Sequence, residues 1–194
     1  MRGIATTLAF VVPMLSVAGC ASSHHAGRAH EHLAHCATGN LILGHGAPVV
    51  PMTGEHAVMY ALTNRSSRTC TLRGYPGVTL FDARGLAMPF RYAHGGGTYV
   101  TSHRPGTIVL AHGASAYVLV AKYRCDQGIA RNAATIRLAL PAAGGRVFTA
   151  REPVGIFGPP GLSYCRGGPH GPGQLITVSP IERTWQATST TAAG

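Results

Sequence analysis

Short apolar runs separated by turn residues recur along this chain. The runs are three to seven residues long, which is within the usual length of a β-strand. Turn residues such as Pro76, Gly85 and Gly113 fall between them, and the sequence after Cys36 shows no sustained helical period. The pattern predicts an all-β domain with strands at residues 41–43, 57–63, 78–81, 108–110, 116–121, 136–140, 147–149 and 175–178.

Two of these runs, 57–63 and 116–121, carry apolar residues on both faces. Strands of this kind lie near the middle of a packed sheet. About eight short strands joined by regular turns are typical of an immunoglobulin-like β-sandwich, which we expect over residues 36–183. The segments 91–106 and 158–173 are rich in glycine, proline and histidine and are predicted to be exposed loops, and 184–194 is predicted to be a disordered tail.

The N-terminal segment predicts export. Residues 4–18 form an apolar run after Arg2, which is the length of a signal-peptide core and shorter than a membrane span of about 20 residues. The run ends in small residues followed by Cys20, which resembles a bacterial lipobox. We therefore expect residues 1–19 to be a lipoprotein signal peptide and Cys20 to carry the lipid that holds the protein at the extracytoplasmic face of the cell membrane. Ordinary signal-peptide cleavage and an unpaired buried Cys20 are the alternatives.

Residues 20–35 are expected to be a lipidated, flexible tether, because their side chains are small or polar and leave almost nothing to bury. The segment is rich in histidine, and neutral imidazole binds copper and zinc. A weakly selective metal site is one interpretation, and a solvated spacer is the other. The candidate metal ligands are His24, His25, His30, His32 and His35.

Four cysteines remain once Cys20 is assigned to the lipid, and an even number in an exported chain predicts disulfides. No Cys-x-x-Cys motif is present, which disfavours a structural zinc site. Three pairings are possible for four cysteines. We favour Cys36–Cys70 and Cys125–Cys165, because in each pair one cysteine ends an extended run and the other opens a run that could lie antiparallel beside it.

The charge balance is strongly basic, with 16 Lys+Arg against 6 Asp+Glu. Outside a membrane the available polyanions are lipid headgroups and phosphate-bearing wall polymers, and nucleic acid is not expected as a partner. Arg65, Arg68 and Arg73 lie on either side of Cys70 and could form one basic patch that binds anionic envelope components or other envelope proteins. Ordinary solubility explains the same charges.

The sequence does not predict an enzyme. It lacks the nucleophile-elbow, phosphate-binding-loop, zinc-protease and dinucleotide-binding motifs. A Ser-His-Asp arrangement could be assembled only from Ser115, His112 and either Asp82 or Asp126, and both aspartates sit where they have structural roles. No cofactor is predicted, apart from copper or zinc at the tether.

Several motifs together resemble a known family, and the most specific of them is a nine-residue string that begins at Cys70. On these motifs the chain resembles the actinobacterial secreted lipoproteins that carry domain of unknown function four-two-three-two, although family members usually have proline where this chain has His112. The resemblance implies a disulfide-containing β-sandwich in an envelope lipoprotein and no established activity. The motifs are Leu62-Thr63-Asn64, Cys70-Thr71-Leu72-Arg73-Gly74-Tyr75-Pro76-Gly77-Val78 and Leu110-Ala111-His112-Gly113-Ala114-Ser115-Ala116, followed by Cys125 and Cys165.

The nine-residue string also suggests a turn. Pro76 fixes the φ angle of one turn position, and Gly77 would take the positive φ angle that a type II turn requires. The functional interpretation of the whole chain is a non-enzymatic binding or interaction module of the cell envelope, and the alternative is an extracytoplasmic copper- or zinc-binding lipoprotein that uses the histidine-rich tether.

Overall fold

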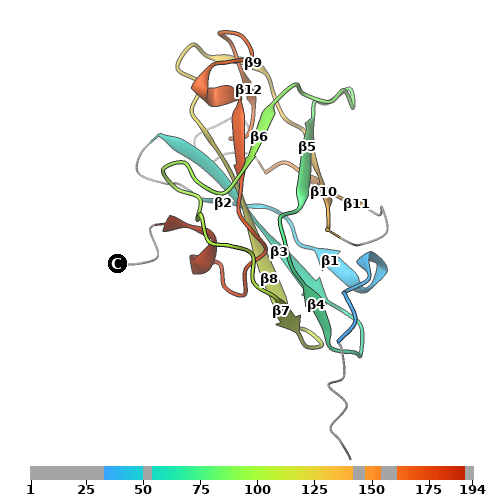
Figure 1. Ribbon diagram of the computed structural model, residues 1–194. Coiled ribbons are helices and arrows are strands. Elements are labelled where there is room, and N and C mark those ends of the chain that lie inside the picture. Colours follow the sequence, from blue (N-terminus) through green and yellow to red (C-terminus); the bar gives the residue numbers. More distant parts are fainter. Residues whose placement is uncertain (1–32, 50–53, 142–146, 154–160, 191–194) are drawn as a thin grey trace, which may run out of the picture. The chain divides into compact units, whose positions relative to one another are not determined.

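The computed structural model describes residues 33–49, 54–141, 147–153 and 161–190. The chain divides into two compact units, Met1–His32 and Leu33–Gly194, and every described residue belongs to the second. The described residues form thirteen strands and three short 3-10 helices, without an α-helix (Figure 1). The strands are β1 (Leu41–Leu43), β2 (Ala47–Val49), β3 (Glu55–Asn64), β4 (Cys70–Leu72), β5 (Gly77–Phe81), β6 (Arg91–His94), β7 (Ile108–Leu110), β8 (Ser115–Tyr123), β9 (Ile129–Arg131), β10 (Thr135–Ala139), β11 (Val147–Arg151), β12 (Tyr164–Cys165) and β13 (Leu175–Val178), and the 3-10 helices are η1 (Thr38–Asn40), η2 (Pro172–Gln174) and η3 (Gln186–Thr188).

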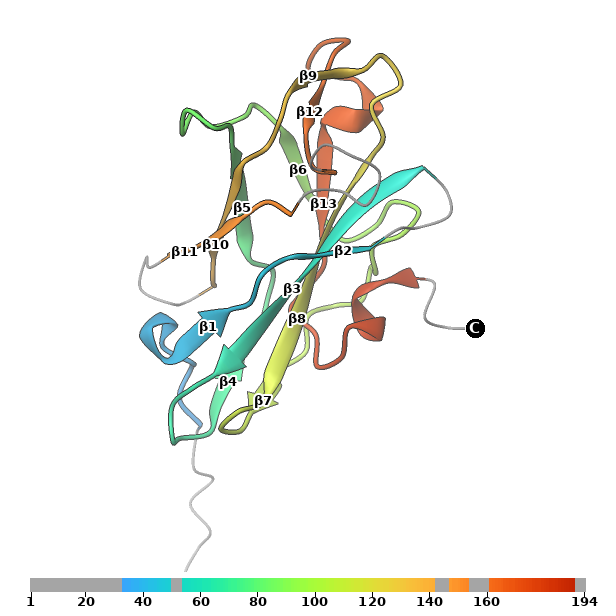
Figure 2. The same cartoon turned by 180° about the vertical axis from the view of Figure 1, so that it is seen from behind.

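The largest sheet has six strands. Its order is β1-β3-β8-β13-β6, and β2 also pairs with β3 (Figure 2). The long antiparallel pair of β3 and β8 forms its centre, with a register that runs from Glu55↔Tyr123 to Thr63↔Ser115. The edge strand β6 is the exception in direction, because it pairs in parallel with β13.

A three-stranded sheet of order β11-β10-β5 faces the large sheet. One core cluster unites the two, with fully buried side chains such as Tyr60 and Val118 from the large sheet and Leu80 and Ile136 from the smaller one. This arrangement is a β-sandwich, so the predicted all-β class is confirmed. Two further pairs, β4-β7 and β9-β12, lie at the two ends of the domain (Figure 1).

The outer side of the large sheet is covered, which corrects the prediction of an exposed loop at 91–106. Residues Arg91–His94 form β6, and Tyr99 and Val100 are buried against Leu119 in a second, smaller core cluster. The glycines of this segment favoured the prediction of a loop. In the structure Gly95, Gly96 and Gly97 all adopt positive φ angles that turn the chain back over the sheet.

The predicted disordered tail at 184–194 is wrong for residues 184–190, while 191–194 lie outside the described residues. Ser189 forms a β-bridge with Val100, and the Thr190 amide donates to the Tyr99 carbonyl at 2.9 Å. Thr188 is completely buried. Backbone hydrogen bonds hold this segment. Because such bonds do not require apolar side chains, the sequence shows no apolar pattern from which the order could be predicted.

Two other boundaries also need correction. The tether was expected to run to His35, but the Thr71 amide donates to the Ala34 carbonyl at 2.9 Å and His35 forms a bridge with Thr71. The predicted loop 158–173 contains β12 and the fully buried Leu162, although residues 158–160 lie outside the described part.

The turn before β5 differs from the expected one. Gly74 takes the positive φ angle, 107°, whereas Gly77 is already extended and pairs with Ala139. A Cβ atom on residue 74 would also meet the Pro141 side chain at 2.9 Å.

In the part of the chain that the structure describes, no helix has the length and apolar character needed to cross a bilayer.

Candidate functional site

The disulfide between Cys125 and Cys165 organises one end of the domain. Cys125 follows β8, the longest strand but one, and Cys165 ends β12. The bond therefore fixes the loop after β8 to the loop that leads into η2. The other disulfide, Cys36–Cys70, lies at the opposite end beside β4. Both pairings are the ones favoured from the sequence.

Lys122 lies directly behind the Cys125–Cys165 disulfide and is only 2% exposed. Its Nζ donates to the Tyr123 carbonyl at 2.7 Å and lies 3.3 Å from Cys165 Sγ. Burial lowers the pKa of Lys122 to about 8, and the negative charge of Glu55 opposes that shift. The side chain is therefore mostly protonated at neutral pH and places a positive charge behind the disulfide.

A hollow of about 90 Å³ opens beside Cys165. Arg124, Arg166 and Gly173 form part of its wall. Glycine is required at position 173, because a Cβ atom there would collide with Cys165 Sγ and would approach the Arg124 carbonyl to 2.9 Å. The close packing of η2 on the disulfide therefore fixes the shape of the hollow.

The two arginines of this wall are held by their inner nitrogens. Arg124 Nε donates to Asp126 Oδ1 at 2.8 Å, and Arg166 Nε donates to the Ile129 carbonyl at 3.3 Å. Arg124 also interacts with the Tyr123 side chain, over whose ring its guanidinium lies at 5.7 Å from the centroid, whereas the terminal Nη groups of Arg166 make no hydrogen bond to another described residue. Paired Nη groups of this kind are the donors with which arginine binds phosphate or carboxylate.

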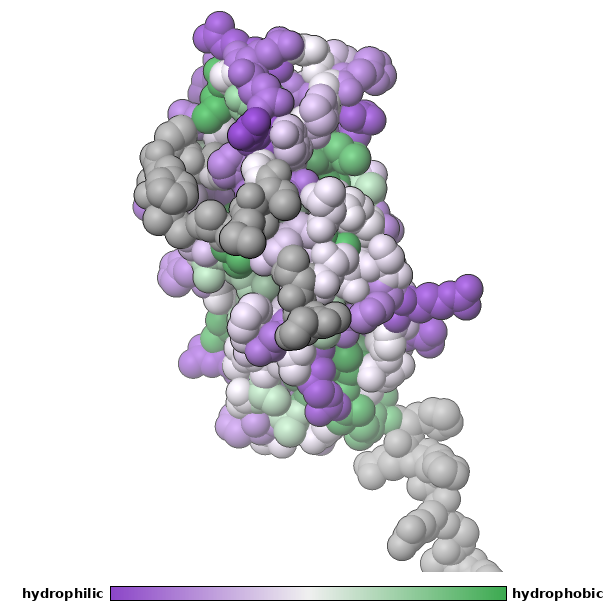
Figure 3. Space-filling model, turned by 90° about the vertical axis from the view of Figure 1, so that its left-hand side faces the viewer, coloured by the Kyte–Doolittle hydropathy of each residue, from purple (hydrophilic) through white to green (hydrophobic). Residues whose placement is uncertain are grey.

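Two more arginines do not line the hollow but contact segments next to it. Arg91 of β6 donates through Nε to the Pro169 carbonyl at 3.1 Å, and so braces the loop before η2. Arg131 of β9 lies over the Tyr164 ring. Hydrophilic side chains gather at this end of the domain (Figure 3). We call Arg91, Arg124, Arg131 and Arg166 the arginine end.

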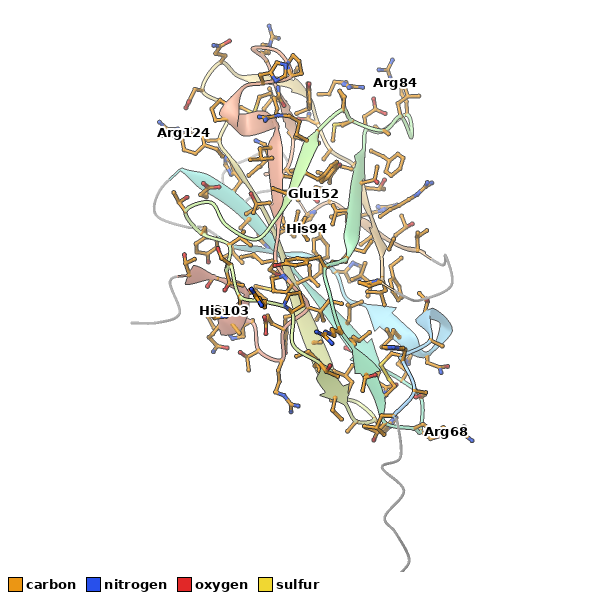
Figure 4. All side chains as sticks on the ribbon, in the orientation of Figure 1. Arg68, Arg84, His94, His103, Arg124 and Glu152 are labelled. Atoms are coloured by element: carbon orange, nitrogen blue, oxygen red, sulfur yellow. A yellow bond between two sulfur atoms is a disulfide. The ribbon has the colours of Figure 1, made fainter. Side chains whose placement is uncertain are left out.

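The carboxylates at the arginine end are already engaged. Asp126 accepts from Arg124, and Asp82 forms salt bridges with Arg131 at 3.6 Å and Arg84 at 3.5 Å. Asp82 also accepts from backbone amides of its own turn, which lower its pKa. Figure 4 shows Arg84 and Arg124 at one end of the domain and Arg68 at the other. Asp126 itself lines the hollow and offsets the charge of Arg124, so Arg166 supplies the net positive charge of the wall that can attract a small anion.

A second unusual group lies inside the core. The hydroxyl of Tyr60 donates to Glu152 Oε2 at 3.0 Å, and Glu152 is only 6% exposed. Its Oε1 atom is the one buried side-chain polar atom without a hydrogen-bond partner among the described residues. Burial raises the pKa of Glu152 to about 7, although the bonds from Tyr60 and from the Leu162 backbone act in the opposite direction. Glu152 is one of six carboxylates in the sequence, and nothing in the sequence predicted that it would be buried.

Most of the predicted metal ligands cannot be placed, because His24, His25, His30 and His32 lie outside the described residues, as does Cys20. His35 is exposed and belongs to the bridge with Thr71. Within the described ranges, no group of three or more His, Cys, Asp or Glu side chains is arranged to hold a metal ion.

The structure does not bring the Ser-His-Asp candidates together in hydrogen-bonded pairs. His112 Nδ1 contacts the Ser66 carbonyl at 2.8 Å, and Ser115 Oγ contacts Thr63 Oγ1 at 2.8 Å. Asp82 and Asp126 have the arginine partners given above. Each of these side chains therefore has a local structural contact.

Comparison with known proteins gives one match. No match was found among the curated proteins or among the solved structures. A family model described as domain of unknown function (DUF4232) matches residues 36–182, which is the whole sandwich from the first disulfide cysteine to the strand pairing of Glu182 with Tyr117. This match covers well over half of the sequence, and the chain therefore belongs to the DUF4232 family.

Proposed function

We propose that this protein is a non-enzymatic binding module of the cell envelope, and that its arginine end binds a phosphate or carboxylate group of an envelope component. In this proposal residues 1–19 are a signal peptide, Cys20 carries the lipid anchor at the extracytoplasmic face of the membrane, and the sandwich is of the immunoglobulin-like type, as in the secreted lipoproteins that the chain resembles.

The observation that carries the proposal is the hollow between Arg124 and Arg166. Its walls are fixed by the Cys125–Cys165 disulfide and by the contact of Gly173 with that disulfide. Preorganised donors lose little conformational freedom when a ligand binds. The positive charge of Lys122 behind the disulfide adds to the attraction of an anion.

The size of the hollow limits the ligand to one small group at a time. Sites for drug-sized molecules usually have volumes of about 300–1,000 Å³, and this hollow is far smaller. Arginine binds phosphate and carboxylate through two parallel N–H donors. We therefore expect the hollow to hold a single anionic group that belongs to a larger envelope molecule or to a free small anion.

Replacing both Arg124 and Arg166 by glutamine should weaken the binding of inorganic phosphate by at least about tenfold, because each charge-assisted hydrogen bond contributes about 1.5–3 kcal/mol. The measurement is calorimetric titration of the chain from residue 20 onward, carrying Cys20→Ala, with inorganic phosphate, acetate and glycerol phosphate as probes. Binding to the unmodified arginine end should also weaken as salt is added.

The matched control replaces Arg104 and Arg183 by glutamine, which removes two exposed arginines outside the arginine end. This variant should bind phosphate as the parent does. Equal weakening in this control would mean that net charge alone attracts the anion, and the site would be lost as a proposal. A preference for glycerol phosphate over free phosphate would identify a lipid or polymer group as the natural ligand, and a preference for acetate would identify a carboxylate.

The anchor has a separate test. When residues 1–19 are replaced by a signal peptide that ordinary signal peptidase removes, the Cys20→Ala chain should be released from cells, whereas the chain with its own first 20 residues should fractionate with membranes. A high-salt wash before fractionation removes proteins held only by charge. Retention of the Cys20→Ala chain after that wash would show that something other than a lipid on Cys20 holds the protein.

The metal-binding alternative stays a prediction. It depends on His24, His25, His30 and His32, which lie outside the described residues, together with His35, which is held beside Thr71. The arginine end does not depend on it.

A further inference from the structure

The end of the domain opposite the hollow carries a surface of a different kind. There β4 and β7 pair through Thr71↔Val109, and side chains alternate between the two sides of such a pair. Cys70, Leu72, Ile108 and Leu110 are all buried in the core. Val109, on the other side, is 40% exposed.

The first described residue lies next to the same pair. The chain runs beside β4, with the Cys36 amide donating to the Thr71 carbonyl at 2.9 Å, and the Cys36–Cys70 disulfide fixes it there. Leu33, two residues before the bridge at His35, is 40% exposed. Two large apolar side chains are thus exposed at the point where the chain enters the domain, and Figure 3 shows hydrophobic surface at this end.

Three exposed arginines lie at the same end of the domain as Leu33 and Val109. Arg65 and Arg68 lie in the turn between β3 and β4, and Arg73 follows β4; all three are exposed. Asn64 fixes the turn, because its Nδ2 donates to the Arg68 carbonyl at 2.8 Å and to the Leu110 carbonyl at 3.0 Å. None of the three arginines forms a salt bridge with a described carboxylate. We call Leu33, Arg65, Arg68, Arg73 and Val109 the basal face.

We propose that the basal face rests on an anionic lipid bilayer. Exposed arginines bind lipid phosphates while leucine and valine enter the boundary between headgroups and acyl chains, a combination that is typical of interfacial binding. The proposal shares with the proposed function the lipid on Cys20 as the link to the membrane, but the contact itself needs no lipid anchor.

The chain enters the domain at this face. Leu33 is 13 residues after Cys20, and a chain of this length spans at most about 45 Å. A lipid on Cys20 therefore keeps Leu33 within that distance of the bilayer, and the exposed arginines and apolar side chains beside Leu33 are what favour contact through this face. Figures 1 and 2 both show β9 and β12 at the other end, so docking through the basal face presents the hollow away from the membrane. The hollow would then take its anion from molecules beyond the bilayer surface and not from the headgroups beneath the domain.

The size of the effect follows from the charges. Each arginine close to an anionic bilayer contributes about 1 kcal/mol, which is about a fivefold change in partition. Replacing all three should lower the partition coefficient on the order of 100-fold. The attraction acts over about one Debye length and so should disappear at high salt.

The test uses the chain from residue 20 onward with the substitution Cys20→Ala, so that no lipid anchor contributes. The measurement is the fraction of this chain that sediments together with lipid vesicles. Vesicles of phosphatidylcholine mixed with phosphatidylglycerol should bind this chain, and vesicles of phosphatidylcholine alone should not. The triple variant Arg65→Gln, Arg68→Gln and Arg73→Gln should lose the binding. The matched control removes the same charge from the other end, through Arg84→Gln, Arg124→Gln and Arg166→Gln, and should keep it.

Two outcomes would overturn the proposal: failure of the parent chain to bind the mixed vesicles, or equal loss of binding in the control triple variant. The basal triple variant should still bind inorganic phosphate as the parent does, because the hollow is intact. A failure of the basal face can therefore be told apart from a failure of the arginine end.

Discussion

Replacing Cys36 and Cys70 together by alanine should lower the free energy of unfolding by about 4 kcal/mol. The disulfide closes a loop with a sequence separation of 34 and has a Cα–Cα distance of 4.9 Å. Without it the unfolded chain gains the conformational freedom of that loop. The folded chain also loses the covalent link that holds residues 33–36 beside β4. Urea unfolding, followed by circular dichroism and tryptophan fluorescence, measures the change.

A single domain usually has a total stability of about 5–15 kcal/mol, so this loss is a large share of it. The control is the parent chain treated with a reductant that opens both disulfides, which should be less stable than the double alanine variant. A double variant within about 1 kcal/mol of the parent would contradict the loop-entropy argument and would indicate that the unfolded chain is already compact.

Replacing Glu152 by glutamine should remove much of the pH dependence of stability between about pH 4.5 and 7. The pKa of Glu152 in the folded protein, about 7, lies above its ordinary value of 4.5. The folded state therefore binds the proton more tightly than the unfolded state does. Its contribution is fully present below pH 4.5 and is lost as the pH rises through 7, a change on the order of 3 kcal/mol.

Glutamine keeps an oxygen that can accept from the Tyr60 hydroxyl but carries no charge, so the Glu152→Gln variant should be more stable than the parent at pH 8 and should approach it at pH 4.5. Urea unfolding at a series of pH values measures this difference. Asp126→Asn, which removes an exposed carboxylate, should leave the pH dependence between 4.5 and 7 largely as it is. A parent and a Glu152→Gln variant with parallel pH profiles would contradict a raised pKa at this position.

The strands that could be predicted from the sequence are those formed by short runs of apolar residues. The predicted runs 108–110 and 175–178 coincide with β7 and β13, and 57–63 and 116–121 lie within β3 and β8. Most of these residues are buried in the core, with Val109 as an exposed exception, and burial produces the apolar pattern from which the strands were predicted.

Five strands were missed, namely β2, β4, β6, β9 and β12, and the reason can be given for two of them. β6 consists of Arg91, Tyr92, Ala93 and His94, and it is an edge strand with exposed side chains. β12 has two residues and is held by the Cys125–Cys165 disulfide and by pairing with β9. Long-range backbone pairing determines both, and a local sequence window contains little information about it.

The candidate site could be predicted only in part from the sequence. The excess of arginine and the disulfide pairing could be recognised, but the patch chosen from the sequence was Arg65, Arg68 and Arg73. The hollow depends on Arg124 and Arg166, which are 42 residues apart in the sequence and meet because of the disulfide. Lys122 and Glu152 lie at positions where the sequence gives no sign that a charged group is buried.

The position of β13 has a consequence for the order in which the domain can be assembled. β13 is the last of the described strands, yet it lies inside the six-stranded sheet, between β8 and β6. Until residues 175–178 have been synthesised and delivered, β6 has no partner and β8 has one open edge. Pairing of this kind joins residues far apart in the sequence and is slow to form. Synthesis from the N-terminus therefore leaves β6 and one edge of β8 unpaired until residues 175–178 follow, so this sheet is completed only after β1 to β12 have been made.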